Sequence, residues 1–479
     1  MKLITSLLLL VLTQTIFGQN KVQKIDSLFT NLYNNEEFNG NVLIAEKGTI
    51  TYKKSFGNAN EITNEKLTEE SIFELASCTK PFTAMAIVIL KERGLLNLDD
   101  KITKFFPELS KYNNVTIRNL LNHTGGLPDY MSLMFSIWDK TKIATNKDVI
   151  KILKTNQSDV RFEPNSKTEY SNTGYVLLAS IIEKASGQSY PDFLKSAIFE
   201  PLQMSNTFVY HRRLSPQKIK NYALGYLYIN DEYILPDDFD RSKFVIWLDG
   251  IEGDGTVNST ILDLYKWDRA LYNNQLVSEK SLEEVFSNGV LDNGSTAKYG
   301  LGWRVLETTP FGKIARHSGG WPGYLTYIER DIDNDKTIII LQNHQNGSMP
   351  KQAVRNILYG MPLPKTMKNL YSEGKTVDQI ITLLEDPVSK YLIDNFYERN
   401  VNRFGYQLME KGKVNDALKI FRYNTVNYPA SSNAFDSLGE CLLQMKNTQQ
   451  AQQAYKKALE LDPTNKNAAS ALAKIHESK

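Results

Sequence analysis

The chain has 479 residues, of which 41% are hydrophobic and 23% are charged. This is the composition of an ordinary globular protein, so neither extensive disorder nor a bundle of membrane-spanning helices is indicated. Lys and Arg number 56 against 54 acidic residues, a formal net charge of +2, which gives no case for nucleic acid or an anionic membrane surface as a partner.

The first residues have the pattern of a secretory signal. Lys2 precedes an apolar run, residues 3–12, that is too short to cross a bilayer, and Gly18 lies in a small-residue cleavage region. We therefore expect residues 1–19 to be removed, leaving a periplasmic or extracellular protein without a membrane span. An N-terminal membrane anchor is the alternative. The two cysteines of the chain lie far apart, so no disulfide framework is expected.

Strands are expected near both ends of the region that follows. A helix over residues 21–34 leads to two strands, 41–45 and 49–56, which a Lys-Gly turn joins into a hairpin. A long helical stretch comes next. Strands return at residues 314–317, 324–330 and 336–342. This order predicts an α+β fold, with one antiparallel sheet built from both ends of the domain and a helical lobe inserted between them.

Ser77 and Lys80 are the first candidates for chemistry. They open an apolar run that predicts a buried helix ending near Gly94, and residues three apart share a helix face. The Lys80 amine could therefore activate the Ser77 hydroxyl for acyl transfer. The alternative is a plain helix N-cap at Ser77. Four other Ser-x-x-Lys matches, which lack such a helix, begin at Ser215, Ser295, Ser348 and Ser372.

Two further short motifs follow along the chain. Tyr170 and Asn172 lie between a polar loop and an apolar helix, and a phenol beside cations can move protons to a leaving group. His317 precedes Gly319 and Gly320 at the end of a predicted strand. Glycines there allow close approach of a substrate, and a free N–H on an edge strand can stabilise an oxyanion. A structural histidine is the alternative.

Other catalytic arrangements lose support. The chain has no Gly-x-Ser-x-Gly elbow and no His-Glu-x-x-His, and its five histidines show no close metal-ligand spacing. We therefore expect neither an α/β-hydrolase nor a zinc peptidase, and no metal. Asp254 lies in a glycine-rich segment, residues 250–258, which we interpret as a loop near the site.

In this order, Ser-x-x-Lys, Tyr-x-Asn and His-x-Gly resemble the motifs of the serine β-lactamase-related family. This family includes class C β-lactamases, penicillin-binding protein-like D-alanyl-D-alanine carboxypeptidases, D-aminopeptidases and esterases. Residues 94–100, 116–128 and 299–303 look like the family as well. The resemblance covers roughly residues 22–362 and implies a β-lactamase/transpeptidase-like fold.

The resemblance implies a role for each motif. Ser77 would be the acylated nucleophile, Lys80 its base, and Tyr170 the proton shuttle to the leaving group. An oxyanion hole would come from the N–H groups of Ser77 and Gly320, and no cofactor would be needed. Substrate contacts would come from Asn172, His317, Gly319 and Gly320. Penicillin-processing members usually have lysine where this chain has histidine, and a mostly neutral histidine attracts a substrate carboxylate less.

The end of the chain has a different pattern. Its residues predict only helices, and four pairs of small, aromatic or proline residues recur 34 positions apart, as in tetratricopeptide repeats. These pairs are Gly405 and Gly439, Ala417 and Ala451, Phe421 and Tyr455, and Pro429 and Pro463. We expect a hydrolase domain over residues 20–362, a helical linker over 363–400, and repeats with a capping helix over 401–479. The repeats could bind a protein or peptide, or serve only as a folding appendage.

The sequence therefore predicts an exported serine hydrolase that acts on a small-molecule or peptide acyl substrate, either an amide or an ester. One alternative is an inactive member of the family that serves as an extracytoplasmic scaffold through its tail. A second alternative is a true β-lactamase. Hydrolysis of a simple ester, compared with that by Ser77→Ala, would separate the enzyme from the scaffold.

Overall fold

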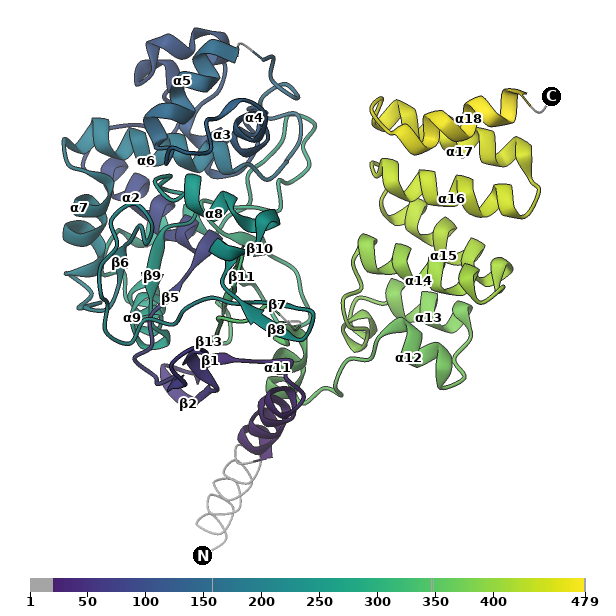
Figure 1. Cartoon of the computed structure of the whole chain (residues 1–479), viewed down its shortest axis with the longest axis horizontal. Helices are drawn as coiled ribbons and strands as arrows, with labels where there is room; N and C mark the ends of the chain where they lie inside the picture. The colour runs from purple at the N-terminus through teal and green to yellow at the C-terminus, as the bar shows by residue number, and fades with distance from the viewer. Residues whose placement is uncertain (1–19, 157, 346, 348, 478–479) are drawn as a thin grey trace, which may run out of the picture. The chain divides into compact units, whose positions relative to one another are not determined.

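The computed structural model describes residues 20–156, 158–345, 347 and 349–477. The predicted signal, residues 1–19, lies outside these ranges. The chain divides into two compact units, one ending at Met349 and one beginning at Pro350, which are described separately (Figure 1). In the described ranges, no helix combines the length and apolar character needed to cross a membrane.

The first unit is built on a six-stranded antiparallel sheet with strand order β10-β11-β12-β13-β1-β2. The pairing of β1 with β13 joins both ends of the unit, because Gly40 of β1 pairs with Gln342 of β13 and Glu46 pairs with Lys336. The predicted α+β fold class is confirmed. The strands are β1 (Gly40–Glu46), β2 (Thr49–Phe56), β10 (Arg304–Leu306), β11 (Ile314–Trp321), β12 (Tyr324–Asp331) and β13 (Lys336–Gln342).

Strand β11 is longer than predicted. It continues past His317 to Trp321, and β10 pairs only with its first residues, Ile314 to Arg316. In the described ranges, the second half of β11 therefore pairs with β12 on one side and with no strand on the other. That free edge begins at the histidine-glycine motif.

Short strands that the sequence did not predict complete the unit. One small sheet has the order β5-β9-β6 and lies beside the nucleophile segment, whereas the other strands form two-stranded pairs. Two or three residues are too few to show an alternating pattern. The short strands are β3 (Asn58–Asn60), β4 (Glu65–Lys66), β5 (Phe73–Glu74), β6 (Phe208–Val209), β7 (Leu227–Ile229), β8 (Glu232–Ile234) and β9 (Val257–Ser259).

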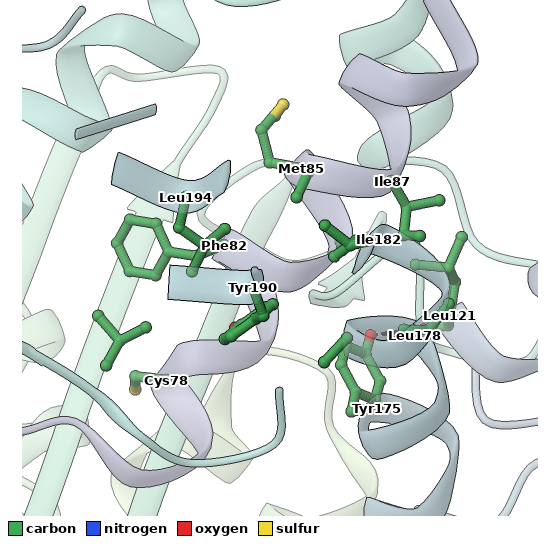
Figure 2. Close-up of a cluster of buried hydrophobic side chains, with 14 of the residues drawn as sticks. Cys78, Phe82, Met85, Ile87, Leu121, Tyr175, Leu178, Ile182, Tyr190 and Leu194 are labelled. Atoms are coloured by element: carbon green, nitrogen blue, oxygen red, sulfur yellow. Dashed lines mark hydrogen bonds between the residues drawn. The ribbon is translucent and has the colours of Figure 1, made fainter. Parts of the chain in front are cut away.

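Helix α2 (Lys80–Glu92) lies at the centre of the helical lobe. Every residue from Lys80 to Leu90 is buried, and Pro81 begins the helix where its missing N–H costs nothing. Figure 2 shows side chains of α2 and α6 (Asn172–Ser186) in one apolar cluster. The remaining helices of this unit include residues 20–34, α3 (Ile117–Leu121), α4 (Tyr130–Ile137), α5 (Asn146–Asn156), α7 (Tyr190–Leu194), α8 (Phe244–Trp247), α9 (Ile261–Tyr272) and α10 (Glu279–Val285).

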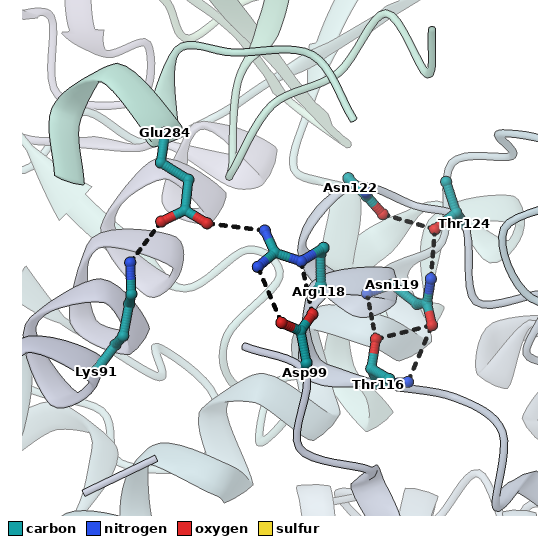
Figure 3. A network of polar contacts seen from close by, with 8 residues as sticks. All are labelled: Lys91, Asp99, Thr116, Arg118, Asn119, Asn122, Thr124 and Glu284. Carbon is teal, nitrogen blue, oxygen red and sulfur yellow. Dashed lines mark hydrogen bonds and ion pairs between the residues drawn. The ribbon is translucent and has the colours of Figure 1, made fainter. Parts of the chain in front are cut away.

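A half-buried ion cluster connects three helices of the lobe (Figure 3). Arg118 of α3 donates to Asp99 at 2.8 Å and to Glu284 of α10 at 2.8 Å, and Lys91 of α2 reaches the same glutamate. The guanidinium bridges two carboxylates, a geometry that lysine could not reproduce. The cluster thereby fixes the far end of α2 to its neighbours.

A chain of polar side chains leads from α3 to the loop at residues 122–128. Thr116 caps α3, and the Asn119 amide donates to Thr124 at 2.9 Å, whose hydroxyl donates to Asn122 at 2.7 Å (Figure 3). Between these two loop residues, His123 adopts a left-handed conformation with φ of 61°. The hydrogen bonds hold a backbone conformation that is unfavourable for a residue with a side chain.

In the described part of the second unit, all of the named elements are helices. Gly405 lies under the ring of Phe421 and Gly439 under that of Tyr455, where an added Cβ would come within 2.6 and 2.8 Å of the ring. The same contact therefore recurs 34 residues along the chain, as the predicted repeat requires. The helices are α11 (Lys351–Leu358), α12 (Met367–Ser372), α13 (Val377–Glu385), α14 (Glu398–Glu410), α15 (Val414–Asn427), α16 (Ser432–Gln444), α17 (Thr448–Leu461) and α18 (Lys466–Glu477).

Candidate active site

Ser77 and Lys80 are in direct contact. Ser77 lies on a single turn of 3-10 helix, Ala76–Thr79, that runs into α2, and the Lys80 ammonium nitrogen is 3.0 Å from the Ser77 Oγ. The same nitrogen donates to the carbonyl oxygen of Asp254 at 2.8 Å. Neither helix uses Ser77 as its N-cap, so the alternative interpretation of this serine is wrong.

The nucleophile segment is held in a strained conformation. Ala76, directly before Ser77, has a positive φ of 49°, which costs a residue with a Cβ about 1–2 kcal/mol. Hydrogen bonds from neighbouring strands hold the segment in place. The Thr326 hydroxyl of β12 donates to the carbonyl of Leu75 at 2.6 Å, and the Val257 N–H of β9 donates to the Thr79 hydroxyl at 3.0 Å.

Tyr170 lies close to the buried lysine. The Lys80 nitrogen is 5.0 Å from the centre of the Tyr170 ring, and 42% of this tyrosine is exposed. The His123 ring stacks on Tyr170 at 4.3 Å, and its Nδ1 accepts the Ser171 N–H at 3.1 Å. Burial lowers the pKa of His123 well below its usual value, so the ring is neutral. The sequence did not identify His123 as a residue that positions Tyr170.

His317 is a residue of β11, but it is not among the residues that line the cavity beside Ser77. It is 5% exposed, and its Nδ1 donates to the Ser318 carbonyl at 2.9 Å, so its Nε2 accepts from the Tyr299 hydroxyl at 2.8 Å. Burial and the nearby Lys80 lower its pKa to about 3. The role of His317 as a substrate contact stays a prediction.

The two glycines of the motif face opposite ways. A Cβ at Gly319 would lie 2.2 Å from the Leu75 carbonyl oxygen, so only glycine lets β11 approach the nucleophile segment this closely. A Cβ at Gly320 would meet nothing within 4 Å, because that position faces the cavity. Successive residues of a strand face opposite sides, so Gly319 packs against the nucleophile segment whereas Gly320 can approach a substrate.

A cavity of about 310 Å³ opens beside Ser77. Asn172 and Gly320, both predicted to contact substrate, line it together with two residues that the sequence did not single out as a pair. These are Tyr130 and Asp254, whose hydroxyl and carboxylate are 3.0 Å apart. Burial raises the pKa of Tyr130 well above its usual value, and burial also raises the pKa of Asp254. No spacing in the sequence could have paired residues so far apart.

The comparisons with known protein families agree with this geometry. A family model described as beta-lactamase matches residues 25–360, and a tetratricopeptide repeat model matches residues 437–465. The C-terminal helical region therefore contains a tetratricopeptide repeat, as its 34-residue periodicity predicted.

Individual relatives support the first match. The chain is 47% identical over 369 residues to penicillin-binding protein 4* of Bacillus subtilis (strain 168), covering 76% of this chain and 82% of that protein. An octameric penicillin-binding protein homologue from Pyrococcus abyssi has a TM-score of 0.62 at 25% identity, covering 76% of this chain and 82% of that one. D-amino acid amidase from Ochrobactrum anthropi SV3 has a TM-score of 0.55 at 27% identity, covering 70% and 93%.

Proposed function

The chain belongs to the beta-lactamase family of serine hydrolases, and we propose that it is an exported enzyme that hydrolyses amides or esters through an acyl-enzyme at Ser77. The observation that carries this proposal is the 3.0 Å contact between Lys80 and the Ser77 hydroxyl at the edge of a cavity. Export rests on the signal pattern of residues 1–19.

Acylation begins with proton transfer from Ser77 to Lys80. In its amine form Lys80 accepts the hydroxyl proton while the Ser77 oxygen attacks the substrate carbonyl carbon. The negative charge that develops on the carbonyl oxygen would be stabilised by the N–H groups of Ser77 and Gly320. The position of Gly320 supports this assignment, because it lies in the cavity wall on the half of β11 that has a strand partner on one side only in the described chain.

Collapse of the intermediate requires a proton on the leaving group. Tyr170 would donate its phenolic proton to the leaving amine or alkoxide and take one back from the Lys80 ammonium, which lies 5.0 Å from its ring centre. Water then attacks the acyl carbon, the bond from this carbon to the Ser77 oxygen breaks, and the oxygen takes up a proton. The carboxylic acid is released and Ser77 is restored. Asn172, in the cavity wall, would hold the amide of the acyl group.

The position of His317 favours amides or esters over β-lactams as substrates. A β-lactam presents a carboxylate, and the neutral, buried His317 offers it no positive charge. The relatives include both a penicillin-binding protein and an amidase, so binding of a penicillin as a slow acylating agent is consistent with the proposal.

Covalent labelling tests the nucleophile directly. We expect a fluorophosphonate or penicillin probe to modify Ser77, with the adduct located by mass spectrometry of the digested protein, and we expect Ser77→Ala to remain unlabelled. In protein recovered from outside the cytoplasm, the same spectra should show an N-terminal peptide that starts near residue 20. A folded protein with no adduct at Ser77 would falsify the acyl-enzyme.

We also propose that the helical unit binds a protein or peptide partner. The tetratricopeptide match supports this, and α12 and α14 border a small cavity of about 150 Å³ that includes Arg403 and Gln407. A photo-crosslinking residue at Gln407 in the intact chain should capture a partner in cells. The same residue at Lys218, exposed on the first unit, should capture none. Identical capture at both positions would contradict a binding role for the repeats.

A further inference from the structure

Glu74 is a carboxylate in the wall of the catalytic cavity that the acyl-transfer steps do not use. It lies on β5, three residues before Ser77, and both residues line the same cavity. Three residues of chain span at most roughly 11 Å. A group bound by Glu74 would therefore belong to the part of the substrate near the acyl carbon.

Three carboxylates line the cavity, and Glu74 differs from the other two in its hydrogen bonding. Asp249 already accepts two backbone N–H groups at 2.7 and 2.9 Å, and Asp254 accepts the Tyr130 hydroxyl at 3.0 Å. In the described ranges, no group donates a hydrogen bond to the Glu74 side chain. A half-buried carboxylate without a donor is unfavourable unless a ligand supplies one.

The charges around Glu74 leave an excess of negative charge. Arg212 and Arg213 both pair with Asp237, and Arg213 also pairs with Asp249 at 3.3 Å. Two positive groups thus face three carboxylates when Glu74 is ionised. Neither arginine lines the cavity, and no described residue that lines it is a lysine, arginine or histidine. A substrate cation would meet attraction here, and a substrate anion would meet repulsion.

Aromatic side chains form much of the remaining wall. Their ring faces attract cations and their bodies accommodate apolar stems, so such a wall suits an ammonium group on a carbon chain. The aromatic residues that line the cavity are Tyr130, Tyr210, Phe244 and Trp321.

We propose that Glu74 determines specificity by binding a primary ammonium group on the acyl part of the substrate. The group could be the free amine of an amino acyl residue or the amine of a basic side chain, which share this chemistry. The inference rests on the proposed function, because it assumes that the acyl group is delivered to Ser77.

The charge of Glu74 changes near neutral pH. Burial raises its pKa to about 7, so the carboxylate gains its charge between roughly pH 6 and 8. A lysine side chain keeps its charge throughout that range. The preference for a substrate with a lysine ammonium group should therefore increase with pH across this interval, whereas an α-amino group itself begins to lose its charge near pH 8. The ionisable groups that face Glu74 are Arg212, Arg213, Asp237, Asp249, Tyr222 and Tyr324, and burial keeps both tyrosines neutral there.

Matched p-nitroanilides test the proposal. One pair is D-alanine and N-acetyl-D-alanine p-nitroanilide, and the other is Nα-acetyl-lysine and Nα-acetyl-norleucine p-nitroanilide. We expect kcat/KM to favour the ammonium member of at least one pair by about 10- to 100-fold, the range for a hydrogen bond between charged groups. The pair that shows the preference identifies the source of the amine.

Glu74→Gln should reduce that preference to less than about threefold and, for the lysine pair, remove its increase between pH 6 and 8. Glu70→Gln, an exposed glutamate four residues earlier, should preserve both. The far-UV circular dichroism spectrum should be the same for all three proteins, which shows that the variants are folded. A preference that survives in Glu74→Gln, or its absence from the wild type, would overturn the proposal.

Failure of the proposed function gives a different result. If p-nitrophenyl acetate is hydrolysed and Ser77 is labelled but no ammonium preference is found, only the role of Glu74 is contradicted. If Ser77 is never acylated, binding still decides the matter. Calorimetry should show that at least one of the two ammonium compounds binds to Ser77→Ala about tenfold or more tightly than to Ser77→Ala/Glu74→Gln. Equal affinities would contradict the ammonium site.

Discussion

Lys80→Met is expected to lower kcat/KM for p-nitrophenyl acetate by roughly 10³- to 10⁴-fold, because it removes the only amine in contact with the Ser77 hydroxyl among the described residues. Methionine has a similar length and apolar stem, so the packing against the neighbouring tyrosines is retained. Steady-state kinetics at saturating and limiting ester concentrations would measure the loss.

The chain provides a matched control for this substitution. Lys218 belongs to another Ser-x-x-Lys match but is exposed, so Lys218→Met should leave the rate unchanged. Because a nucleophile and its base act as a unit, the Ser77→Ala/Lys80→Met double variant should be no slower than Ser77→Ala alone. A loss of less than tenfold in Lys80→Met would mean that another group accepts the serine proton.

Asp268→Asn is expected to destabilise the first unit by about 3–5 kcal/mol, the cost of removing one partner from a buried ion pair. Asp268 is fully buried on α9 and accepts from Arg330 of β12 at 3.0 Å and from Thr337 of β13 at 2.6 Å. Arg330 is 1% exposed and stacks on Tyr272 at 4.2 Å, so its charge would be left inside the protein without a carboxylate.

Urea unfolding followed by tryptophan fluorescence would measure this change. All five tryptophans lie between residues 138 and 321, so their emission reports the first unit alone. Asp240→Asn, which removes the carboxylate of an exposed pair with Lys243, should not shift the midpoint. Adding Arg330→Met to Asp268→Asn should recover part of the loss, since the uncompensated charge is gone. If stability is not recovered, the loss in Asp268→Asn comes mainly from the missing hydrogen bonds and not from the unpaired charge.

Much of the fold was predictable because its signals are local. The β1–β2 hairpin and the strands β12 and β13 have clear apolar patterns, and the repeat in the tail can be read from residues 34 positions apart. The contact between Ser77 and Lys80 was predictable for the same reason, since one helical turn brings them together. The lysine proved to be fully buried, which spacing alone does not reveal.

The rest of the site depends on contacts between distant segments. Asp254 meets Tyr130 across 124 positions, and Glu74 enters the cavity only because β5 pairs with β9. The end of β11 was predicted too early, because two consecutive glycines are typical of a loop. That strand's register also decides which side of the sheet His317 faces, and a shift of one residue would reverse it.

The pairing of β1 with β13 has a consequence for the order in which activity is acquired. Asn39 and Asn343, at the ends of this pair, share a hydrogen bond of 2.7 Å although 304 residues separate them. A pairing of such long range forms slowly, because loop closure precedes the contacts that stabilise it. Until β13 has been synthesised, β1 and β2 form only an isolated hairpin, which is marginally stable in water. The strand β12 that braces Leu75 also comes late in the chain. Ser77 and Lys80 are therefore made early as neighbours, but the chain becomes competent for catalysis only after nearly all of the first unit has been synthesised.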